Sequence, residues 1–307
     1  MYTEYYGLME LPFALTPDPR LIYFTPSHTE VMANLHYGIE SGKGLIVVTG
    51  EVGTGKTTIL RWMMQRLDRT VLVAYIFNPR LSVTEFYQHL ASLLDIQNWE
   101  TKPELLTSLG EALFSRHARG LRTVLIVDEA QGLSPALLEE IRLLSNFESD
   151  TAKHLQIVLS GQPELRDVLN NPELRQLKQR VALRCMIETL PSVVETDRYI
   201  TSRLLLSGAA RTDIFSREAI DYIYRCTEGI PRNINNLCDN ALLAGYAAGE
   251  ITIGRSIVEE VAESLDMIPG SDRGLQTGEE RELPAPIFYP ASRVELWATG
   301  ATADLTN

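Results

Sequence analysis

The chain has 307 residues, of which 45% are hydrophobic and 22% are charged, a composition typical of soluble globular proteins that excludes collagen-like and wholly disordered classes. Lys and Arg total 28 against 40 Asp and Glu, which gives a formal net charge of −12. This acidic balance does not favour a general nucleic-acid coat, because neutralising phosphates requires clustered cations. Three widely separated cysteines, Cys185, Cys226 and Cys238, argue against a disulfide framework and against a structural zinc site.

The amino-terminal residues do not have the pattern of a signal peptide, a basic stretch followed by an apolar one. The apolar runs at 71–77 and 124–127 are too short to cross a bilayer. We therefore expect a cytoplasmic protein without a membrane span.

Short β-branched runs alternate with helical stretches in the first part of the chain, which predicts an α/β fold with a parallel sheet covered by helices. Strands are expected at 45–48, 70–77, 123–127, 155–159 and, from a weaker pattern, 185–188. A helix is expected at 57–67, and further helices should begin after Ser82, Thr101 and Ser134, which have the patterns of helix caps.

The pattern changes at about residue 191, where the strand runs stop. Helices are expected at about 196–206, 216–225, 231–248 and 254–265. After these, apolar periodicity disappears and Gly, Pro, Ser and Thr become frequent. We therefore predict an α/β core at 1–190, including the amino-terminal segment, a helical lid domain at 191–268 and a flexible tail at 269–307.

A phosphate-binding motif follows the first predicted strand and precedes the first predicted helix. It reads Gly50-Glu51-Val52-Gly53-Thr54-Gly55-Lys56-Thr57, followed by Thr58. Glycines at this spacing let successive backbone N–H groups point into one concavity at a helix N-terminus, where they bind phosphate. Lys56 is expected to reach the β- and γ-phosphates, and the Thr57 hydroxyl to bind Mg²⁺.

A second motif lies about 70 residues downstream, where the strand at 123–127 is followed by Asp128 and Glu129. The carboxyl ends of parallel strands share one edge of a sheet, so both carboxylates should lie beside the phosphates. Asp128 is expected to hold Mg²⁺, directly or through water, and Glu129 to orient the attacking water. This pair favours ATP hydrolysis over phosphorylation of a small molecule.

These motifs, together with the helical lid, resemble an AAA+ ATPase. The resemblance implies a polar sensor after the fourth strand, at Ser160 or Gln162, that touches the γ-phosphate or the attacking water. It implies a second sensor, Arg232, that reaches the γ-phosphate from the lid. It also implies an arginine finger before the last strand, Arg180 or Arg184, although these two could equally form part of a solvated basic face.

The same resemblance implies two further contacts. Asn78, after the second strand, would hydrogen-bond the water-orienting glutamate, or would simply favour a turn before a proline. Tyr23 and Phe24 would form a wall beside adenine, opposite Ile230 and Pro231, or would be core residues.

A finer resemblance rests on the amino-terminal segment and two loops. These stretches are Tyr5-Tyr6-Gly7-Leu8, Pro12-Phe13, Thr16-Pro17-Asp18-Pro19, Tyr23, the phosphate motif, and Gly161-Gln162-Pro163-Glu164-Leu165. Over about residues 1–266 the chain is similar to the ATPase domain of the general secretion pathway protein A (ExeA-like) family. Members often continue into a membrane span and a peptidoglycan-binding domain, which this sequence does not display. The same class is similar to regulators of transposition that assemble on DNA.

The resemblance implies hydrolysis of ATP to ADP and phosphate with Mg²⁺, in a homo-oligomeric ring or filament, because a finger supplied by a neighbour requires assembly. Three functions remain open: a switch ATPase in secretion or envelope assembly with a protein partner still to be identified, an ATP-dependent DNA-binding regulator of transposition, and an ATP-gated scaffold with negligible turnover.

Overall fold

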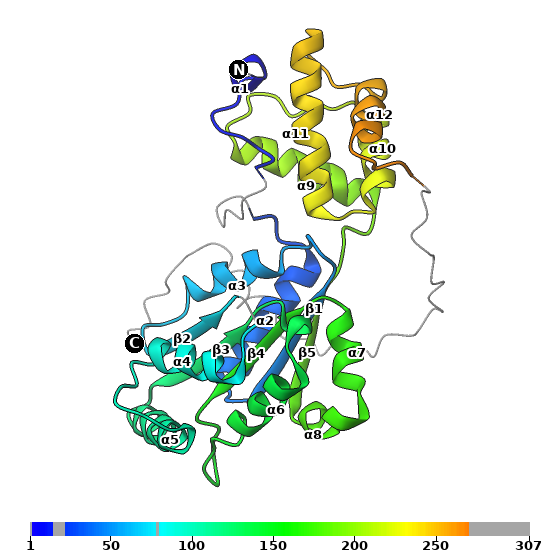
Figure 1. The fold of residues 1–307 in the computed structure, drawn as a ribbon. Helices are drawn as coiled ribbons and strands as arrows, with labels where there is room; N and C mark the ends of the chain where they lie inside the picture. The colour runs from blue at the N-terminus through cyan, green and yellow to red at the C-terminus, as the bar shows by residue number, and fades with distance from the viewer. Residues whose placement is uncertain (1, 15–21, 78–79, 270–307) are drawn as a thin grey trace.

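The chain forms an α/β domain and a helical domain, which lie one above the other in Figure 1. The computed structural model describes residues 2–14, 22–77 and 80–269. Asn78 and residues 270–307, which include nearly all of the predicted tail, lie outside the described residues.

The α/β domain is built on a sheet of five parallel strands in the order β2-β3-β4-β1-β5. The strands are β1 (Leu45–Gly50), β2 (Val71–Ile76), β3 (Arg122–Val127), β4 (Gln156–Gly161) and β5 (Val181–Ile187). Every residue of β1 and β4 is buried, as expected for parallel strands covered on both faces. These central strands are the continuous apolar runs that the sequence predicts.

The edge strand β5 begins at Val181, four residues before its predicted start, so Arg184 lies inside the strand and not before it. Leu183, Cys185 and Ile187 face the core, whereas Arg184 is exposed between them. The prediction was wrong here because an edge strand has one neighbour and alternates between buried and exposed residues, which hides the apolar run.

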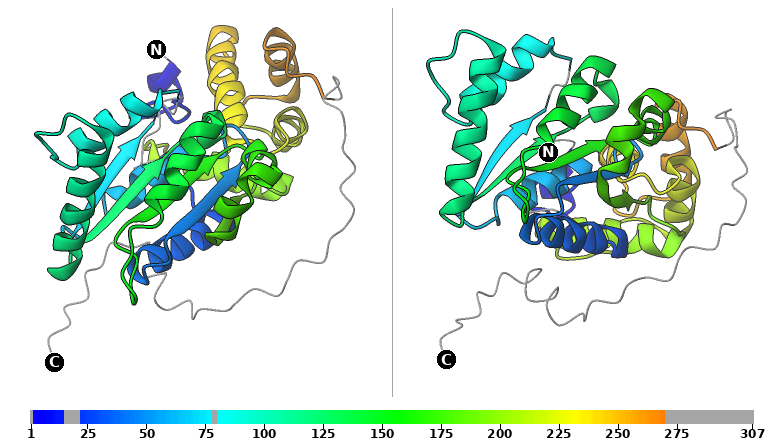
Figure 2. Two further views of the ribbon diagram at one scale, coloured as in Figure 1. Left: turned by 60° about the horizontal axis from the view of Figure 1, so that its bottom comes forward. Right: turned by 90° about the horizontal axis from the view of Figure 1, so that it is seen from below.

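Helices cover both faces of the sheet (Figure 2). On one face lie α2 (Pro26–Glu40) and α3 (Lys56–Met64), and on the other lie α4 (Val83–Leu93), α5 (Lys102–Ala118), α6 (Pro135–Leu144), α7 (Glu164–Asn170) and α8 (Arg175–Gln179). The capping boxes predicted at Ser82 and Thr101 are both formed, since each side chain accepts a hydrogen bond from the backbone N–H three residues later. The predicted cap at Ser134 is also present.

The helical domain consists of α9 (Val193–Leu206), α10 (Arg217–Thr227), α11 (Pro231–Ala248) and α12 (Arg255–Ser264), close to the predicted ranges. Its core also contains the amino-terminal segment, residues 2–13, which includes the short helix α1 (Tyr2–Tyr5). Phe13 is completely buried with its ring edge-to-face against Phe215, and the Tyr6 hydroxyl donates to the Glu250 carbonyl over 3.0 Å.

The amino-terminal segment therefore packs with the helical domain, whereas the sequence-based division placed it in the α/β core. The physical reason is that four short helices enclose a small core, which gains several large side chains from this segment. Within the described part of the chain, no helix is both long and apolar enough to span a membrane.

Candidate functional site

The turn between β1 and α3 has the backbone geometry of a phosphate-binding loop. Gly53 and Gly55 adopt φ values of +86° and +99°, a left-handed conformation that side chains other than glycine rarely adopt. Lys56, the first residue of α3, is buried, and its Nζ donates to the carbonyls of Gly50 and Glu51 over 2.7 and 2.9 Å. The loop thus combines a helix N-terminus, flexible glycines and a buried cation, all of which favour an anion.

The helical domain contacts this loop directly. The Arg232 backbone N–H donates to the Gly53 carbonyl over 3.2 Å, and a Cβ on Gly53 would lie 2.6 Å from the Cβ of Arg232. Arg232 is the second residue of α11, so the start of this helix is held against the phosphate loop.

Asp128, directly after β3, is the centre of a buried hydrogen-bond network. Its Oδ2 accepts from the Thr57 hydroxyl over 2.7 Å and from the Tyr75 hydroxyl over 3.0 Å. Its Oδ1 accepts from the Ser160 hydroxyl over 2.9 Å and from the Glu129 backbone N–H over 3.0 Å. Burial, followed by the charge of Asp128, raises the pKa of Tyr75, so this tyrosine stays a donor.

The two candidates for the first sensor lie in different places. Ser160 is completely buried, and its hydroxyl donates to Asp128 Oδ1. The side-chain amide of Gln162 donates to Glu129 Oε2 over 3.2 Å. Of the two, Gln162 is therefore the one joined to the expected water-orienting residue.

Glu129 lies at the edge of the same cavity as Lys56, in a left-handed conformation with φ +52°. Burial lowers the pKa of Lys56, while the nearby carboxylates of Glu129 and Asp128 oppose that shift. Lys56 and Glu129 thus line one cavity, and Asp128 directly precedes Glu129 in the chain.

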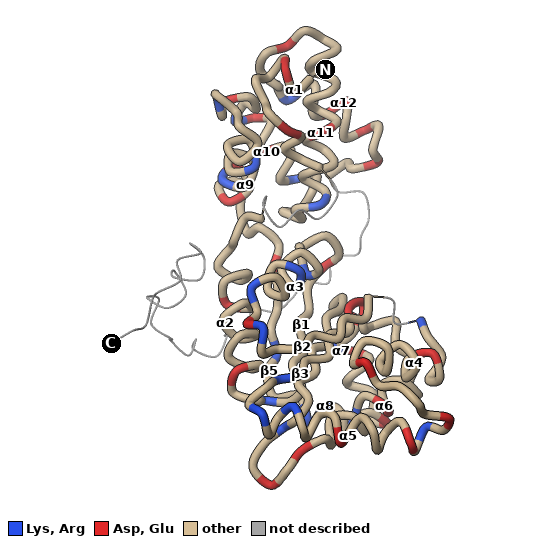
Figure 3. The backbone as a smooth tube through the Cα atoms, turned by 90° about the vertical axis from the view of Figure 1, so that its left-hand side faces the viewer, with Lys and Arg blue, Asp and Glu red and all other residues tan. Residues whose placement is uncertain are grey.

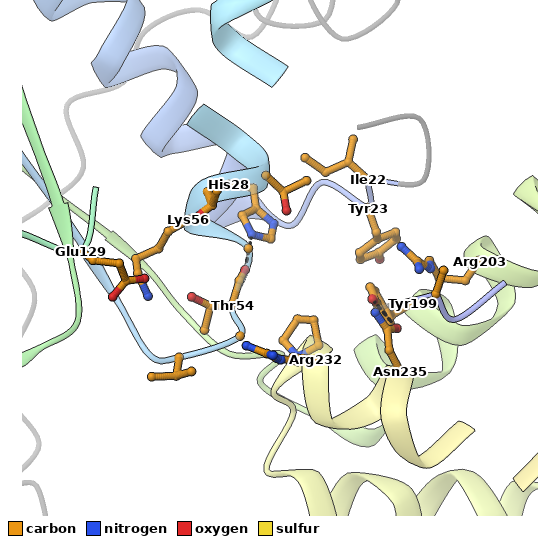
Figure 4. Close-up of a pocket in the computed structure, with 17 residues that line it drawn as sticks. Ile22, Tyr23, His28, Thr54, Lys56, Glu129, Tyr199, Arg203, Arg232 and Asn235 are labelled. Atoms are coloured by element: carbon orange, nitrogen blue, oxygen red, sulfur yellow. Dashed lines mark hydrogen bonds between the residues drawn. The ribbon is translucent and has the colours of Figure 1, made fainter. Parts of the chain in front are cut away.

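Lys56, Glu129 and residues of the phosphate loop line a cavity of about 320 Å³ between the two domains (Figure 4). The lining comes from the phosphate loop and the start of α3, from Glu129, from residues that precede α2, from α2 and from the helical domain. These residues are Ala14, Ile22, Tyr23, His28, Val52, Gly53, Thr54, Gly55, Lys56, Thr57, Thr58, Glu129, Tyr199, Arg203, Pro231, Arg232 and Asn235. Figure 4 shows Lys56 and Glu129 at one end, which we call the phosphate end, and Tyr23, Tyr199, Arg203 and Asn235 at the other, which we call the far end.

At the far end, the Tyr23 ring lies edge-to-face with Tyr199 at a centroid distance of 5.8 Å. The Tyr199 hydroxyl donates to Asn235 Oδ1 over 2.8 Å, and Arg203 Nε donates to the Pro12 carbonyl over 2.7 Å. The amino-terminal segment, the residues that precede α2 and the helical domain therefore meet here.

Of the residues expected to contact a base, Tyr23 and Pro231 line the cavity. Ile230 is the N-cap residue of α11, and its Cγ2 lies 3.1 Å from where a Cβ on Gly53 would be. Phe24 packs against Trp62, with centroids 5.0 Å apart, and is not among the residues that line the cavity. This contact agrees with the alternative that Phe24 is a core residue.

Sequence reasoning missed His28, Tyr199, Arg203 and Asn235. Asn235 follows Arg232 by three residues on one helix, so helical spacing could have identified it. His28 is buried at the start of α2; its Nε2 lies 3.0 Å from the Thr54 carbonyl, to which it donates. Its Nδ1 accepts from the Thr25 backbone N–H over 3.2 Å, and burial lowers its pKa.

The two candidate finger residues lie away from the cavity of their own chain. Arg180 ends α8, where its Nη1 donates to the Ser145 hydroxyl over 3.2 Å. Arg184 is paired in register with Val47, in the middle of β1. Both are thus displaced from the carboxyl edge of the sheet, where the phosphate loop begins.

The site fits a nucleotide and a magnesium ion by its chemistry. A hydroxyl and a carboxylate, from Thr57 and Asp128, are in direct contact, and oxygen donors of this kind suit Mg²⁺ that is also bound by phosphates and water. Among the described residues, no cluster of three or more His, Cys, Asp or Glu side chains forms a separate metal site.

Residues 39–169 match the sequence model of the AAA domain family. With the parallel sheet, the phosphate loop and the helical domain, this match defines the chain as an AAA+ P-loop protein and confirms the resemblance predicted from its sequence.

The chain is also 41% identical over 251 residues to general secretion pathway protein A of Aeromonas hydrophila. This similarity covers 81% of the chain and 46% of the relative, so the chain spans about half the length of that protein.

Solved structures share the fold at lower identity. Cdc6p from Pyrobaculum aerophilum is 19% identical with a TM-score of 0.65, covering 85% of this chain and 72% of its own. The ORC2 protein of Aeropyrum pernix, in ADPNP and ADP complexes, is 15% identical with a TM-score of 0.60, covering 82% and 71%. Drosophila ORC bound to DNA is 18% identical with a TM-score of 0.61, covering 83% and 66%.

Proposed function

We propose that the chain hydrolyses ATP to ADP and phosphate with Mg²⁺, and that it does so in a homo-oligomer that remodels or switches a macromolecular partner. The contact between Thr57 and Asp128 carries this proposal, because a hydroxyl that follows the phosphate loop and a carboxylate that follows β3 are oxygen ligands of the kind that Mg²⁺ prefers, next to Lys56. Glu129 lines the same cavity.

Each residue then has a separate role. Lys56 and Arg232 neutralise charge on the transferring phosphoryl group from the two domains, and Glu129 aligns the attacking water. Thr57 and Asp128 hold the magnesium ion, which supplies charge neutralisation at the β- and γ-phosphate oxygens. Catalysis rests mainly on positioning and electrostatic stabilisation.

Assembly is part of the proposal because Arg180 and Arg184 lie away from their own cavity. An arginine on this side of the α/β domain is available to a neighbouring subunit, whose phosphate end it would complete. A ring or a filament both satisfy this requirement.

The similarity to general secretion pathway protein A supports a partner in secretion or envelope assembly. We place the ATPase in the cytoplasm, where ATP and Mg²⁺ are supplied. Figure 3 shows acidic and basic residues interspersed over both domains, which gives no reason to prefer DNA as the partner.

An assay of phosphate release from Mg²⁺-ATP tests the activity. Glu129→Gln should keep ATP affinity close to wild type and lose at least about a hundredfold in turnover, because it removes the water-orienting carboxylate. Lys56→Ala should instead weaken ATP binding itself. Wild-type turnover in the Glu129→Gln protein would contradict the assigned role, and undetectable turnover in the wild type would leave an ATP-gated scaffold.

Electron microscopy with a non-hydrolysable ATP analogue, with and without duplex DNA, tests assembly and partner. Rings or filaments that need only nucleotide support the proposal. Filaments that form only on DNA, and weaken with salt, would favour the transposition regulator instead.

A further inference from the structure

The carboxylate of Glu129 is held on one of its two oxygens by a pair of amide side chains. Gln131 Nε2 donates to Glu129 Oε2 over 2.6 Å, and Gln162 Nε2 donates to the same oxygen over 3.2 Å. Because both donors use Oε2, and no other residue in the described part of the chain donates to this side chain, Oε1 can accept a hydrogen bond from water. The two amides thereby distinguish the oxygens of a carboxylate that are otherwise equivalent.

The orientation of the Gln131 amide is fixed by a second hydrogen bond. Its Oε1 accepts from the Gln162 backbone N–H over 3.0 Å. A backbone N–H can only donate, so the other end of the amide, the NH₂ group, must face Glu129. Gln131 lies in the short helix η2 (Ala130–Gly132) after β3, and Gln162 lies directly after β4, so the amide joins two neighbouring strand ends.

The backbone leaves room for this amide. A Cβ on Gly161 would lie 2.7 Å from Gln131 Oε1, a distance that real contacts of this kind essentially never show. Glu129 itself has φ +52°, an uncommon conformation for a residue with a side chain. Strained conformations of this kind persist where the surroundings over-determine them, and they concentrate at functional sites.

We propose that Gln131 is a positioning residue that fixes the Glu129 carboxylate for the attacking water, with Gln162 as the second donor. This inference rests on the proposed ATP hydrolysis and adds to it the group that selects the rotamer of the water-orienting residue. Without the amides, the Glu129 side chain samples several rotamers, and only a fraction of the molecules holds water in line with the phosphate.

Gln131→Met tests the proposal, since methionine has a similar length but cannot donate to a carboxylate. We expect kcat for ATP hydrolysis to fall about tenfold to a hundredfold while KM and ATP affinity stay within about twofold, because misplacement by about 1 Å costs this much. Gln97→Met, at an exposed glutamine in another part of the domain, is the matched control and should hydrolyse ATP at the wild-type rate.

A second variant keeps the Gln131 amide but displaces it from its position. Gly161→Ala introduces the Cβ that would displace Gln131 Oε1, and it should also lower kcat with little change in KM. If Gln131→Met proves unstable in thermal unfolding, the kcat of Gly161→Ala tests the proposed role of Gln131 instead. Wild-type kcat in either variant, with the protein folded, would overturn the proposal.

The Glu129→Gln background separates positioning from a structural role. If Gln131 acts through the Glu129 carboxylate, Gln131→Met should not lower the residual rate of Glu129→Gln further. An equal loss in both backgrounds would overturn the inference while leaving the proposed ATPase intact. A wild-type protein whose hydrolysis does not depend on Glu129 would instead refute the proposed function itself.

Discussion

The two ends of the cavity are built in different ways. The phosphate end consists of the turns that follow β1 and β3, so its groups come from short stretches of one domain. The far end combines Tyr23 with Tyr199, Arg203 and Asn235, which lie in α9 and α11 of the helical domain. Local backbone geometry therefore forms the first end whenever the sheet is folded, whereas the second depends on the packing of segments that lie far apart in the sequence.

The largest expected effect is a loss of ATP turnover that tests whether the phosphate end is complete within one chain. The arginine finger is expected to be either Arg180 or Arg184, so both are replaced by alanine in separate variants. The variant that lacks the finger should bind ATP normally and lose about a thousandfold in turnover. Mixing this variant with Glu129→Gln should restore part of the activity, because some interfaces then pair an intact Glu129 with an intact arginine.

Phosphate release across mixing ratios and protein concentrations measures this effect. Specific activity should rise with concentration, since a lone subunit has an incomplete site. No rescue in the mixture, together with concentration-independent specific activity, would mean that the phosphate end is complete in a monomer.

The next prediction concerns a variant that disturbs the contact between the phosphate loop and α11. In Gly53→Ala, the new Cβ would lie 2.6 Å from the Cβ of Arg232, and the residue would have to adopt φ +86°. We expect ATP affinity to fall by about tenfold or more, from backbone strain of about 1–2 kcal/mol and from displacement of α11. Titration with a fluorescent ATP analogue measures the loss.

Gly249→Ala is the control, because Gly249 also has a positive φ, +74°, but a Cβ there would meet no atom within 4 Å. It should lower the free energy of unfolding and leave ATP affinity unchanged. Equal losses of affinity in both variants would show that strain, and not docking, is responsible.

A smaller effect concerns the far end alone. Tyr199→Phe removes the 2.8 Å hydrogen bond to Asn235 and leaves a buried amide oxygen without that donor. We expect ATP affinity to fall about fivefold to tenfold, which corresponds to about 1 kcal/mol for such a bond, with kcat nearly unchanged. Tyr224→Phe, which removes an exposed hydroxyl contact to the Pro191 carbonyl, should change neither.

The smallest effect concerns the anchor of the phosphate loop on α2. Burial lowers the pKa of His28, and its Nδ1 accepts from the Thr25 backbone N–H, so the folded protein favours the neutral ring. The unfolded chain binds a proton with the ordinary pKa of about 6.5. His28 should therefore leave the free energy of unfolding unchanged above about pH 6.5. Below that pH the free energy of unfolding should fall, by at most about 1.4 kcal/mol per pH unit for one proton.

Urea unfolding between pH 8 and pH 5 measures this contribution as the difference between wild type and His28→Gln. The wild-type curve should fall more steeply below about pH 6.5. If the free energies of unfolding of the two proteins change in parallel with pH, His28 has the same pKa in the folded and unfolded states.

The sequence predicted the phosphate end far better than the far end, for a physical reason. Asp128 follows the apolar strand β3 directly, and Lys56 and Thr57 follow β1 after a short loop. Parallel strands bring their carboxyl ends together whatever the rest of the chain does. Helix caps at Ser82 and Thr101 are equally local and were correctly predicted.

The far end depends on contacts between segments that no local pattern relates. Tyr6 and Phe13 are as apolar as any core residue, and nothing in their spacing distinguishes packing on the sheet from packing on α11. The amide of Gln131 was missed because its contact with Glu129 depends on the left-handed backbone at that residue.

The packing of residues 2–13 with the helical domain has a mechanical consequence. The polypeptide passes between the two domains twice, once between Tyr23, which packs against the helical core, and α2, and once where β5 leads into α9. A domain attached at two points can swing about the line through them but cannot rotate freely. If the chain hydrolyses ATP as proposed, we therefore expect the helical domain to open like a flap along one direction. The amino-terminal segment packs with this domain, so it is a suitable position for a probe of that movement.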